Sequence, residues 1–354
     1  MANDRRFEKF RFRAEIDWIS FEMLTGRRTN IEGIRNHLRD RFDISPHVRS
    51  LDKNGNPFSG HSANSPSNRF QITLHDPGKW DEVDVILTYL ERKYGFVSPV
   101  KVTGAEIALD AYSRGATERE LAEMVAGFCK FQFNPVSENR RLVWKERAEE
   151  NARILGAPDA FLYSDLCHYM ENGATVYLGN QKTTSSDHTR DPLSQRAYLK
   201  RTTTRNGEVI PLPETEYRAR LELIIQRGEN GEEGLSGKNG LPGTNWNDWK
   251  NCRFEFIKKG GYFQFVTFRD EDTFSDRERE LAALGFHKYF QRRGMQLGRK
   301  KVKRLPIGGK VVRTGRYRVF TRADQELNGF AYEALRGLSQ RWEGKNTGSP
   351  VFRH

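Results

Sequence analysis

The chain has 354 residues, of which 36% are hydrophobic and 30% charged, a composition typical of a folded protein with a sizeable core. No apolar run approaches the roughly 20 residues needed to cross a bilayer, and no apolar stretch follows Met1 as in a signal peptide. We therefore expect a cytoplasmic protein without membrane contact. The three cysteines, Cys129, Cys167 and Cys252, lie far apart and are expected to be buried thiols.

The net charge of +12 is concentrated in one segment. Between Leu281 and Ala323 there are thirteen lysines and arginines and no acidic residue, which accounts for the whole surplus of 59 basic over 47 acidic residues. A solvated basic face usually interleaves acids, so this block favours contact with a polyanion, here DNA. The predicted DNA-binding residues are Arg292, Arg293, Arg299, Lys300, Lys301, Lys303, Arg304, Lys310, Arg313, Arg316 and Arg318.

The first third of the chain alternates between strand and helix periodicity. Thr117 and Glu120 stand at capping-box spacing and predict the start of a helix. In order, the predicted elements are strand 14–23, helix 31–42, loop 52–68, strand 69–74, helix 80–94, strand 101–111 and helix 118–128.

The remaining two thirds are expected to be richer in strands. Glycine recurs at every third position from Gly228 to Gly243, a collagen-like pattern that is short and poor in proline, and we interpret it as a flexible loop. The predicted elements are helix 140–155, strands 174–178, 195–201 and 217–226, a hairpin of 254–257 and 262–267 turned at Lys259-Gly-Gly, and helices 275–292 and 323–342.

These elements group into a predicted domain order. It comprises an N-terminal α/β region (1–135), a catalytic sheet region (136–270) with its Gly-X-Y loop (228–245), a basic and C-terminal helical region (271–342), and a tail (343–354).

One predicted strand brings a tyrosine together with cations. Side chains alternate between the faces of a strand, so Arg196, Tyr198 and Lys200 share one face. Cations beside a phenol favour the phenolate, and they can bind a phosphate and stabilise its developing charge. This pattern indicates a tyrosine nucleophile; a surface tyrosine in a basic sheet is the alternative that these residues alone leave open.

Carboxylates come from two other predicted strands. Glu106 and Asp110 share one face of their strand, and Glu222 lies on a third strand beside Arg220. Acids that converge from adjacent strands can hold Mg²⁺ or Mn²⁺, which prefer oxygen ligands. Salt bridges between Glu222, Arg218 and Arg220 are the alternative, and spacing does not decide between the two.

Five motifs in order resemble the replication initiation factors, which are rolling-circle initiators of staphylococcal-type plasmids and filamentous phages. They are Ile16-Asp-Trp-Ile-Ser-Phe, Gly104-Ala-Glu-Ile-Ala-Leu-Asp110, Thr175-Val-Tyr-Leu-Gly179, Arg196-Ala-Tyr-Leu-Lys200 and Arg220-Leu-Glu222. The family's first aspartate of the second motif is Glu106 here, and its preceding arginine is Ala105. No His-hydrophobic-His pair of an ordinary HUH endonuclease is present.

The resemblance implies an α+β fold with an antiparallel-sheet palm related to the HUH nucleases, duplicated or extended by a second α/β region. It implies an origin-specific, metal-dependent nickase that joins the 5′ phosphate to Tyr198. Glu106, Asp110 and Glu222 match the acidic positions, and Arg196 and Lys200 accompany the nucleophile. The implied partners are double-stranded and hairpin origin DNA, a host helicase and a second copy of the chain. The implied location is the cytoplasm of a bacterial host.

Two further hypotheses remain beside this one. A sequence-specific DNA-binding regulator on the same fold, without cutting activity, would use the same basic block. A tyrosine recombinase is less well supported, because the region around Tyr198 is rich in strands rather than helices.

Overall fold

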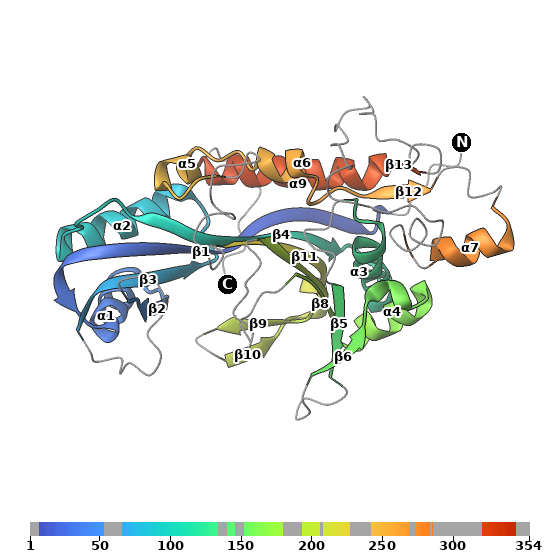
Figure 1. Ribbon diagram of the computed structural model, residues 1–354, viewed down its shortest axis with the longest axis horizontal. Helices are drawn as coiled ribbons and strands as arrows, with labels where there is room; N and C mark the ends of the chain where they lie inside the picture. The colour runs from blue at the N-terminus through green and yellow to red at the C-terminus, as the bar shows by residue number, and fades with distance from the viewer. Residues whose placement is uncertain are drawn as a thin grey trace. The chain divides into compact units, whose positions relative to one another are not determined.

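The computed structural model describes residues 7–52, 66–133, 140–145, 152–179, 193–205, 208–226, 242–268, 274–283, 285 and 321–344. It is a mixed α/β fold with a large antiparallel sheet. Hydrogen bonds order nine strands as β2-β3-β1-β4-β11-β8-β7-β5-β6, and two smaller sheets pair β9 with β10 and β12 with β13 (Figure 1).

The described residues fall into two compact units, each assembled from separate segments. Unit 1 contains Met1–Ala14, Ala108–Leu223 and Phe254–Arg336, and unit 2 contains Glu15–Ile107, Ile224–Arg253 and Gly337–His354. The long strands β1 (Phe10–Thr29), β4 (Lys101–Ser113) and β11 (Arg218–Gln226) contribute residues to both. The predicted division of the chain near residues 135 and 270 stays a prediction.

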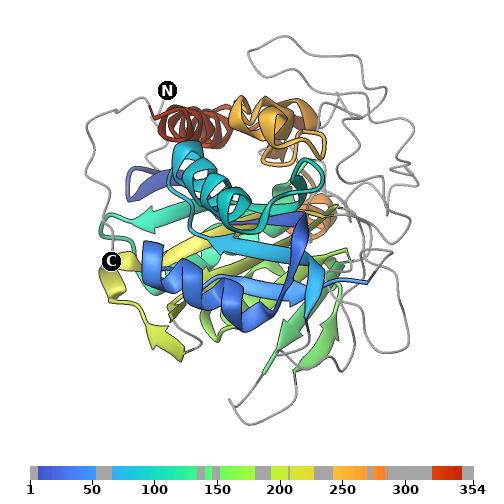
Figure 2. The same cartoon turned by 90° about the vertical axis from the view of Figure 1, so that its left-hand side faces the viewer.

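In unit 2, helices cover both faces of a part of the sheet. Figure 2 shows α2 on one side of the strands and α1 on the other. β1 pairs antiparallel with β3 in a register that sets Trp18 opposite His75 and Phe21 opposite Ile72. The elements particular to this unit are α1 (Ile31–Phe42), β2 (His47–Ser50), β3 (Ser67–His75), α2 (Trp80–Tyr94) and α5 (Trp246–Lys250).

An N-cap begins α1, and tryptophan hydrogen bonds join α5 to α2 and to α9. Asn30 accepts a hydrogen bond from the Gly33 amide at 2.6 Å and so begins α1. Trp246 donates to Asp84 of α2 at 3.0 Å, and the Trp342 indole donates to the Trp249 carbonyl at 2.8 Å. The indole donors are thereby satisfied while their rings fill the core of unit 2.

Unit 1 builds its part of the sheet against α3, and α3 packs closely with α4. Thr117 and Glu120 form the predicted capping box at the start of α3, which confirms that prediction. The elements of this unit are α3 (Glu118–Phe131), β5 (Arg140–Trp144), β6 (Arg153–Gly156), a 3₁₀ turn (Pro158–Ala160), α4 (Tyr163–Glu171), β7 (Thr175–Leu178), β8 (Leu193–Lys200), β9 (Thr202–Arg205), β10 (Glu208–Pro211), a second 3₁₀ turn (Glu214–Glu216), α6 (Glu255–Gly260), β12 (Val266–Phe268), α7 (Asp276–Ala283), β13 (Thr321–Ala323) and the start of α9 (Gln325–Trp342).

The predicted helix over 140–155 is wrong where the structure describes it. β5 and β6 form an antiparallel pair there, and β5 also pairs with β7. Arg140 and Leu142 are buried while Arg141 is half-buried, so the segment follows the strand period of two. Pairing with β7 overrides the helix propensity of this charged sequence.

The predicted hairpin around Lys259-Gly-Gly is also wrong. Residues Glu255–Gly260 form α6, and Gly261 adopts a left-handed conformation with φ of 72°. A glycine in this conformation ends a helix, so the glycine pair marks a C-cap rather than a hairpin turn. β12 pairs with β13 instead.

Candidate functional site

Charged side chains from neighbouring strands meet on one face of the sheet. β4, β11 and β8 are consecutive in the strand order, as Figure 1 shows. Asp110, Arg220 and Glu222 have no more than 1% of their side chains exposed. Charged groups so deeply buried are costly unless each is paired, and here they pair with one another.

Asp110 and Arg220 form a two-pronged ion pair within unit 1. Arg220 donates from Nε to Oδ1 and from a terminal nitrogen to Oδ2 of Asp110, each at 2.7 Å. Arg218 approaches the same carboxylate, with its Nε 3.3 Å from Oδ2. The carboxylate of Asp110 is therefore occupied by two guanidinium groups. The salt-bridge alternative named Glu222, Arg218 and Arg220, and of its pairs the structure shows Arg220 with Glu222.

Glu222 connects this pair to the predicted nucleophile. The Tyr198 hydroxyl donates to Glu222 Oε1 at 2.7 Å, and Arg220 donates to the same oxygen at 3.4 Å. Arg196 donates from Nε to the other carboxylate oxygen. A buried carboxylate held by two arginines thus accepts the hydrogen bond of a half-buried phenol, and the distance is suitable for transfer of its proton.

Cations and polar groups surround Tyr198 on this face. The Arg196 guanidinium lies 5.6 Å from the centroid of the Tyr198 ring. Across the β7–β8 pairing, Thr175 lies opposite Tyr198 and Tyr177 lies opposite Arg196. Lys200 is half-buried on the same strand. The structure therefore brings together Arg196, Tyr198 and Glu222 of the predicted site.

The opposite face of β8 is fixed by buried amides. Gln132 donates to Gln195 Oε1 at 2.8 Å, and both amides donate to the Tyr262 carbonyl, at 2.6 and 2.9 Å. Gln132 and Gln195 are fully buried. This link between α3, β8 and the turn at Tyr262 holds the register of β8, and with it the direction of Tyr198.

Three carboxylates could hold a metal ion. Asp17, Glu106 and Glu222 each offer an oxygen, and these oxygens lie within 4.8 Å of one another. Oxygen donors of this kind suit Mg²⁺ or Mn²⁺, so the residues fit such a cation. Asp110, which the sequence placed in the metal set, does not belong to this group, whereas Asp17 does and was missed. Its signal was its place in the first motif, Ile16-Asp-Trp.

The surroundings of Glu106 orient its carboxylate. The Trp18 indole donates to Glu106 Oε2 at 2.8 Å. Trp18 reaches this position over Gly104, where an added Cβ would come within 3.1 Å of both the Trp18 ring and the Ile225 carbonyl. A side chain at residue 104 would therefore crowd both the tryptophan that holds Glu106 and the backbone of Ile225.

A second cationic contact extends along the same strands in unit 1. The guanidinium groups of Arg11 and Arg218 lie 5.2 and 4.9 Å from the centroid of the Tyr112 ring. Arg11 is exposed, whereas Arg218 is buried. The Tyr112 ring thus holds two cations, of which only Arg11 is accessible from solvent.

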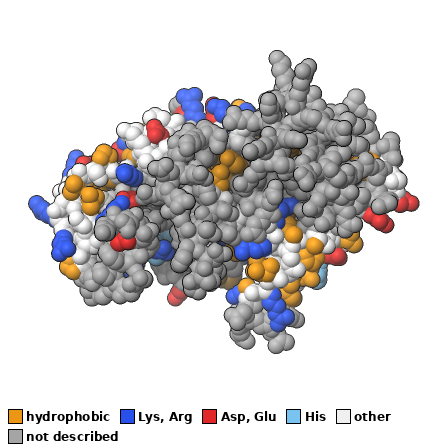
Figure 3. All heavy atoms as spheres, viewed as in Figure 1, with side chains coloured by type: hydrophobic (Ala, Val, Ile, Leu, Met, Phe, Trp, Pro, Cys, Tyr) orange, Lys and Arg blue, Asp and Glu red, His pale blue; other side chains and the backbone are white. Residues whose placement is uncertain are grey.

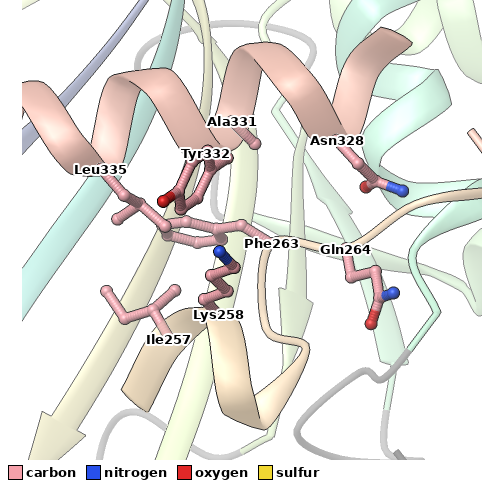
Figure 4. A pocket seen from close by; sticks show the side chains of 8 residues that line it. All are labelled: Ile257, Lys258, Phe263, Gln264, Asn328, Ala331, Tyr332 and Leu335. Atoms are coloured by element: carbon pink, nitrogen blue, oxygen red, sulfur yellow. The ribbon is translucent and has the colours of Figure 1, made fainter. Parts of the chain in front are cut away.

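A second candidate site among the described residues is a small hollow that offers no group suited to catalysis. The small hollow between α6 and α9 in Figure 4 is lined largely by apolar side chains, and the Lys258 ammonium lies 3.5 Å from the Tyr332 ring centroid. Asn328, at its edge, hydrogen-bonds both backbone groups of Phe265. We interpret the hollow as a packing defect with a cation–π contact.

The cysteines are buried and free, which confirms that prediction. Burial raises the pKa of the Cys167 thiol to about 11, so this residue is a poor nucleophile. On the face in Figure 3, basic side chains are spread among hydrophobic and polar ones over the described residues. The predicted DNA-binding residues from Arg292 to Arg318, and most of the Gly-X-Y loop, lie outside the described residues.

Comparison with known proteins finds one distant structural likeness and no sequence relative. No protein family profile and no curated protein matches the chain. A solved rolling circle replication initiator protein from Geobacillus stearothermophilus is 13% identical, covers 62% of this chain and 75% of its own, and has a TM-score of 0.28. The likeness is distant. Within the described residues, no helix is both long and apolar enough to span a membrane.

Proposed function

We propose that this chain nicks and rejoins one strand of origin DNA to initiate rolling-circle replication. The observation that carries the proposal is the hydrogen bond from the Tyr198 hydroxyl to Oε1 of the buried Glu222, at 2.7 Å. A nucleophile, a base within hydrogen-bond reach and groups that orient the base are the parts that covalent catalysis requires. Arg196 and Arg220 are the orienting groups here.

Glu222 Oε1 accepts the phenol proton as the Tyr198 oxygen bonds to the phosphorus of the scissile phosphate. The bond from phosphorus to the 3′ oxygen breaks, and that oxygen takes up a proton from solvent. The products are a 5′-phosphotyrosine and a free 3′ hydroxyl. The phosphotyrosine keeps the phosphodiester bond energy for the rejoining step, which needs no other energy source.

Arg196 and Lys200 lie on β8 with Tyr198 and are suited to bind the non-bridging oxygens of the phosphate. Glu222 accepts hydrogen bonds from both Arg196 and Tyr198, so this carboxylate positions the guanidinium group as well as the phenol. Exposed Arg11 and the predicted basic block would bind the flanking DNA.

Asp17, Glu106 and Glu222 would hold a divalent cation, Mg²⁺ or Mn²⁺, whose Lewis acidity polarises the phosphate. Asp110 lies outside this group of three carboxylates and is paired with Arg218 and Arg220, so we assign it to the support of Arg220. A host helicase and a second copy of the chain remain predicted partners.

The test is an incubation with supercoiled DNA that carries the replicon's own origin, with Mg²⁺ or Mn²⁺, and wild type beside Tyr198→Phe. We expect nicked circles with the wild type and none with the variant, while the two bind origin DNA with nearly equal affinity. Origin binding without nicking by the wild type would instead support the non-cutting regulator.

A further inference from the structure

The third sequence motif contains a tyrosine that has no task in the proposed reaction. Tyr177 of β7 lies opposite Arg196 of β8 on one side and opposite Arg141 of β5 on the other. Residues directly opposite each other in neighbouring strands project from the same face of a sheet. Arg141, Tyr177 and Arg196 therefore form one row across three strands of unit 1, which we call the Tyr177 row.

The Tyr177 row lies on the polar and partly open face of these strands. All three of its residues are half-buried. The residues that alternate with them along the strands, such as Leu142, Val176 and Ala197, are fully buried on the opposite face. The core of the sheet is therefore on that opposite side, and the row can be reached from solvent.

Tyr177 has a half-buried ring without a partner in the described part of the chain. Its hydroxyl forms no hydrogen bond with the described residues, and its ring contacts no other described ring or cation. The Tyr112 ring differs, because the guanidinium groups of Arg11 and Arg218 lie beside it. The Tyr177 ring is thus available to stack on an aromatic group of a ligand.

Arg141 supplies a positive charge at the end of the row. One of its terminal nitrogens donates to the Gly179 carbonyl at 3.2 Å, which holds the guanidinium beside the end of β7. Over the ranges that the structure describes, no carboxylate forms an ion pair with Arg141. An arginine that is positioned in this way, without an acidic partner, suits an anionic group such as a phosphate.

The face of the sheet on the other side of Tyr198 is closed. Asp110, Arg220 and Glu222 have at most 1% of their side chains exposed, and they pair with one another. A polymer whose phosphate lies at Tyr198 therefore finds accessible polar side chains over β7 and β5 rather than over β11. This direction leads along the Tyr177 row.

We propose that the Tyr177 row binds the unpaired nucleotides beside the scissile phosphate, with a base stacked on the Tyr177 ring and a phosphate bound to Arg141. The inference rests on the proposed function, which places the scissile phosphate at Tyr198. Thr175 is opposite Tyr198, so Tyr177 is its diagonal neighbour, at about 7 to 8 Å between Cα atoms. A DNA strand advances about 3.4 Å per stacked nucleotide, so the stacked base lies within about two nucleotides of that phosphate.

The occupant is single-stranded DNA because stacking on a protein ring requires an exposed base face. In a duplex the faces of each base are covered by the neighbouring base pairs, whereas unpaired bases stack on aromatic side chains whatever their sequence. The cation at the end of the row adds a contact to the backbone of the same strand.

The first test is affinity for single-stranded DNA, measured without a metal ion. The probes are a labelled thymidine oligonucleotide of about twelve nucleotides and a duplex of the same length. Tyr177→Val removes the ring but keeps a residue that favours strands, and we expect about tenfold weaker binding of the single strand with duplex affinity unchanged. Tyr177→Phe keeps the ring and should bind as the wild type does. The control Tyr332→Leu alters a tyrosine that is 38% exposed on α9, and it should leave both affinities unchanged.

The second test is the salt dependence of single-strand binding. Each phosphate neutralised on a single strand contributes about −0.7 to the slope of log K against log salt, so Arg141→Gln should reduce the slope by about that amount. Arg336→Gln, which alters an exposed arginine of α9, is the control and should keep the wild-type slope. A substitution that only disturbs packing would change the affinity without this change in slope.

Three results would overturn the inference: single-strand affinity that Tyr177→Val leaves unchanged, equal losses with Tyr177→Val and Tyr177→Phe, or an unchanged slope with Arg141→Gln. Because these measurements involve no cleavage, they can support the row even if the wild type does not nick origin DNA, in which case only the proposed function fails. If the wild type nicks and Tyr177→Val binds and nicks equally well, only the inference about the row fails.

Discussion

At the scale of single residues, the site depends on one buried carboxylate with several tasks. Glu222 accepts hydrogen bonds from Tyr198, Arg196 and Arg220. The sequence placed Tyr198, Arg196 and Glu222 on suitable strand faces, because alternation along a strand is regular. It could not show that Asp110 pairs with Arg220. A role for Asp110 as a metal ligand and a role as the partner of Arg220 both fit the alternation along β4, and only the register between β4 and β11 decides which groups meet.

We predict that Glu222→Gln lowers the nicking rate about 10² to 10⁴-fold, because an amide cannot accept the phenol proton. Glu214→Gln, an exposed acid shortly before β11, is the matched control and should keep the wild-type rate. Single-turnover nicking over a range of Mg²⁺ concentrations checks this. Recovery of the rate at high Mg²⁺ would assign Glu222 to metal binding alone, and a rate within a few fold of wild type would refute both roles.

We predict that Asp110→Ala lowers the free energy of unfolding by about 3 to 5 kcal/mol, because it leaves Arg220 buried without its two-pronged partner. The control is Glu333→Gln, which breaks an exposed pair with Arg336 and should cost at most about 1 kcal/mol. Urea unfolding measures both. Equal effects of the two substitutions would show that the Asp110–Arg220 pair is not a structural support.

At the scale of elements, prediction succeeded where periodicity and caps agreed. The capped helix at Thr117 and the apolar stripe of α9 both gave clear signals. The β9–β10 ribbon was missed although Asn206-Gly207 between β-branched runs is a strong hairpin signal. The described parts of 140–155 were misassigned because charged residues favour a helix locally, while β5 pairs with β7 and with β6 instead.

In unit 2, Asp84 of α2 contacts two residues of α5: it accepts a hydrogen bond from Trp246 and forms an ion pair with Lys250. Burial of this carboxyl acts to raise its pKa, but hydrogen bonds from Lys250 and Trp246 outweigh burial and leave the pKa below its ordinary value of 3.8. A lowered pKa in the folded state contributes stability that is present above the ordinary value and is lost as the pH falls through the lowered one.

We therefore predict that Asp84→Asn destabilises the protein at pH 7 and that this difference shrinks as the pH falls below 3.8. Glu91→Gln, an exposed acid on the same helix, is the control and should leave the pH profile unchanged. Urea unfolding between pH 3 and 7 checks this. A difference that stays constant over this range would show that the Asp84 contacts do not depend on its charge.

At the scale of the whole molecule, charge and topology give different kinds of information. The basic block between Leu281 and Ala323 predicts DNA as a partner, but composition does not show which strands carry the chemistry. The large sheet supplies that information, because strands distant in the sequence become neighbours in the order β1-β4-β11-β8. The contribution of Asp17 to the acidic group became visible only through this order.

The most direct measurement is the identification of the residue that becomes covalently attached to DNA. Wild-type protein would be incubated with origin DNA and Mg²⁺, the adduct digested with a protease and a nuclease, and the modified peptide sequenced by mass spectrometry. We expect a nucleotide on Tyr198, joined through a 5′ phosphate. Attachment to Tyr177, or nicking with no covalent adduct, would contradict it.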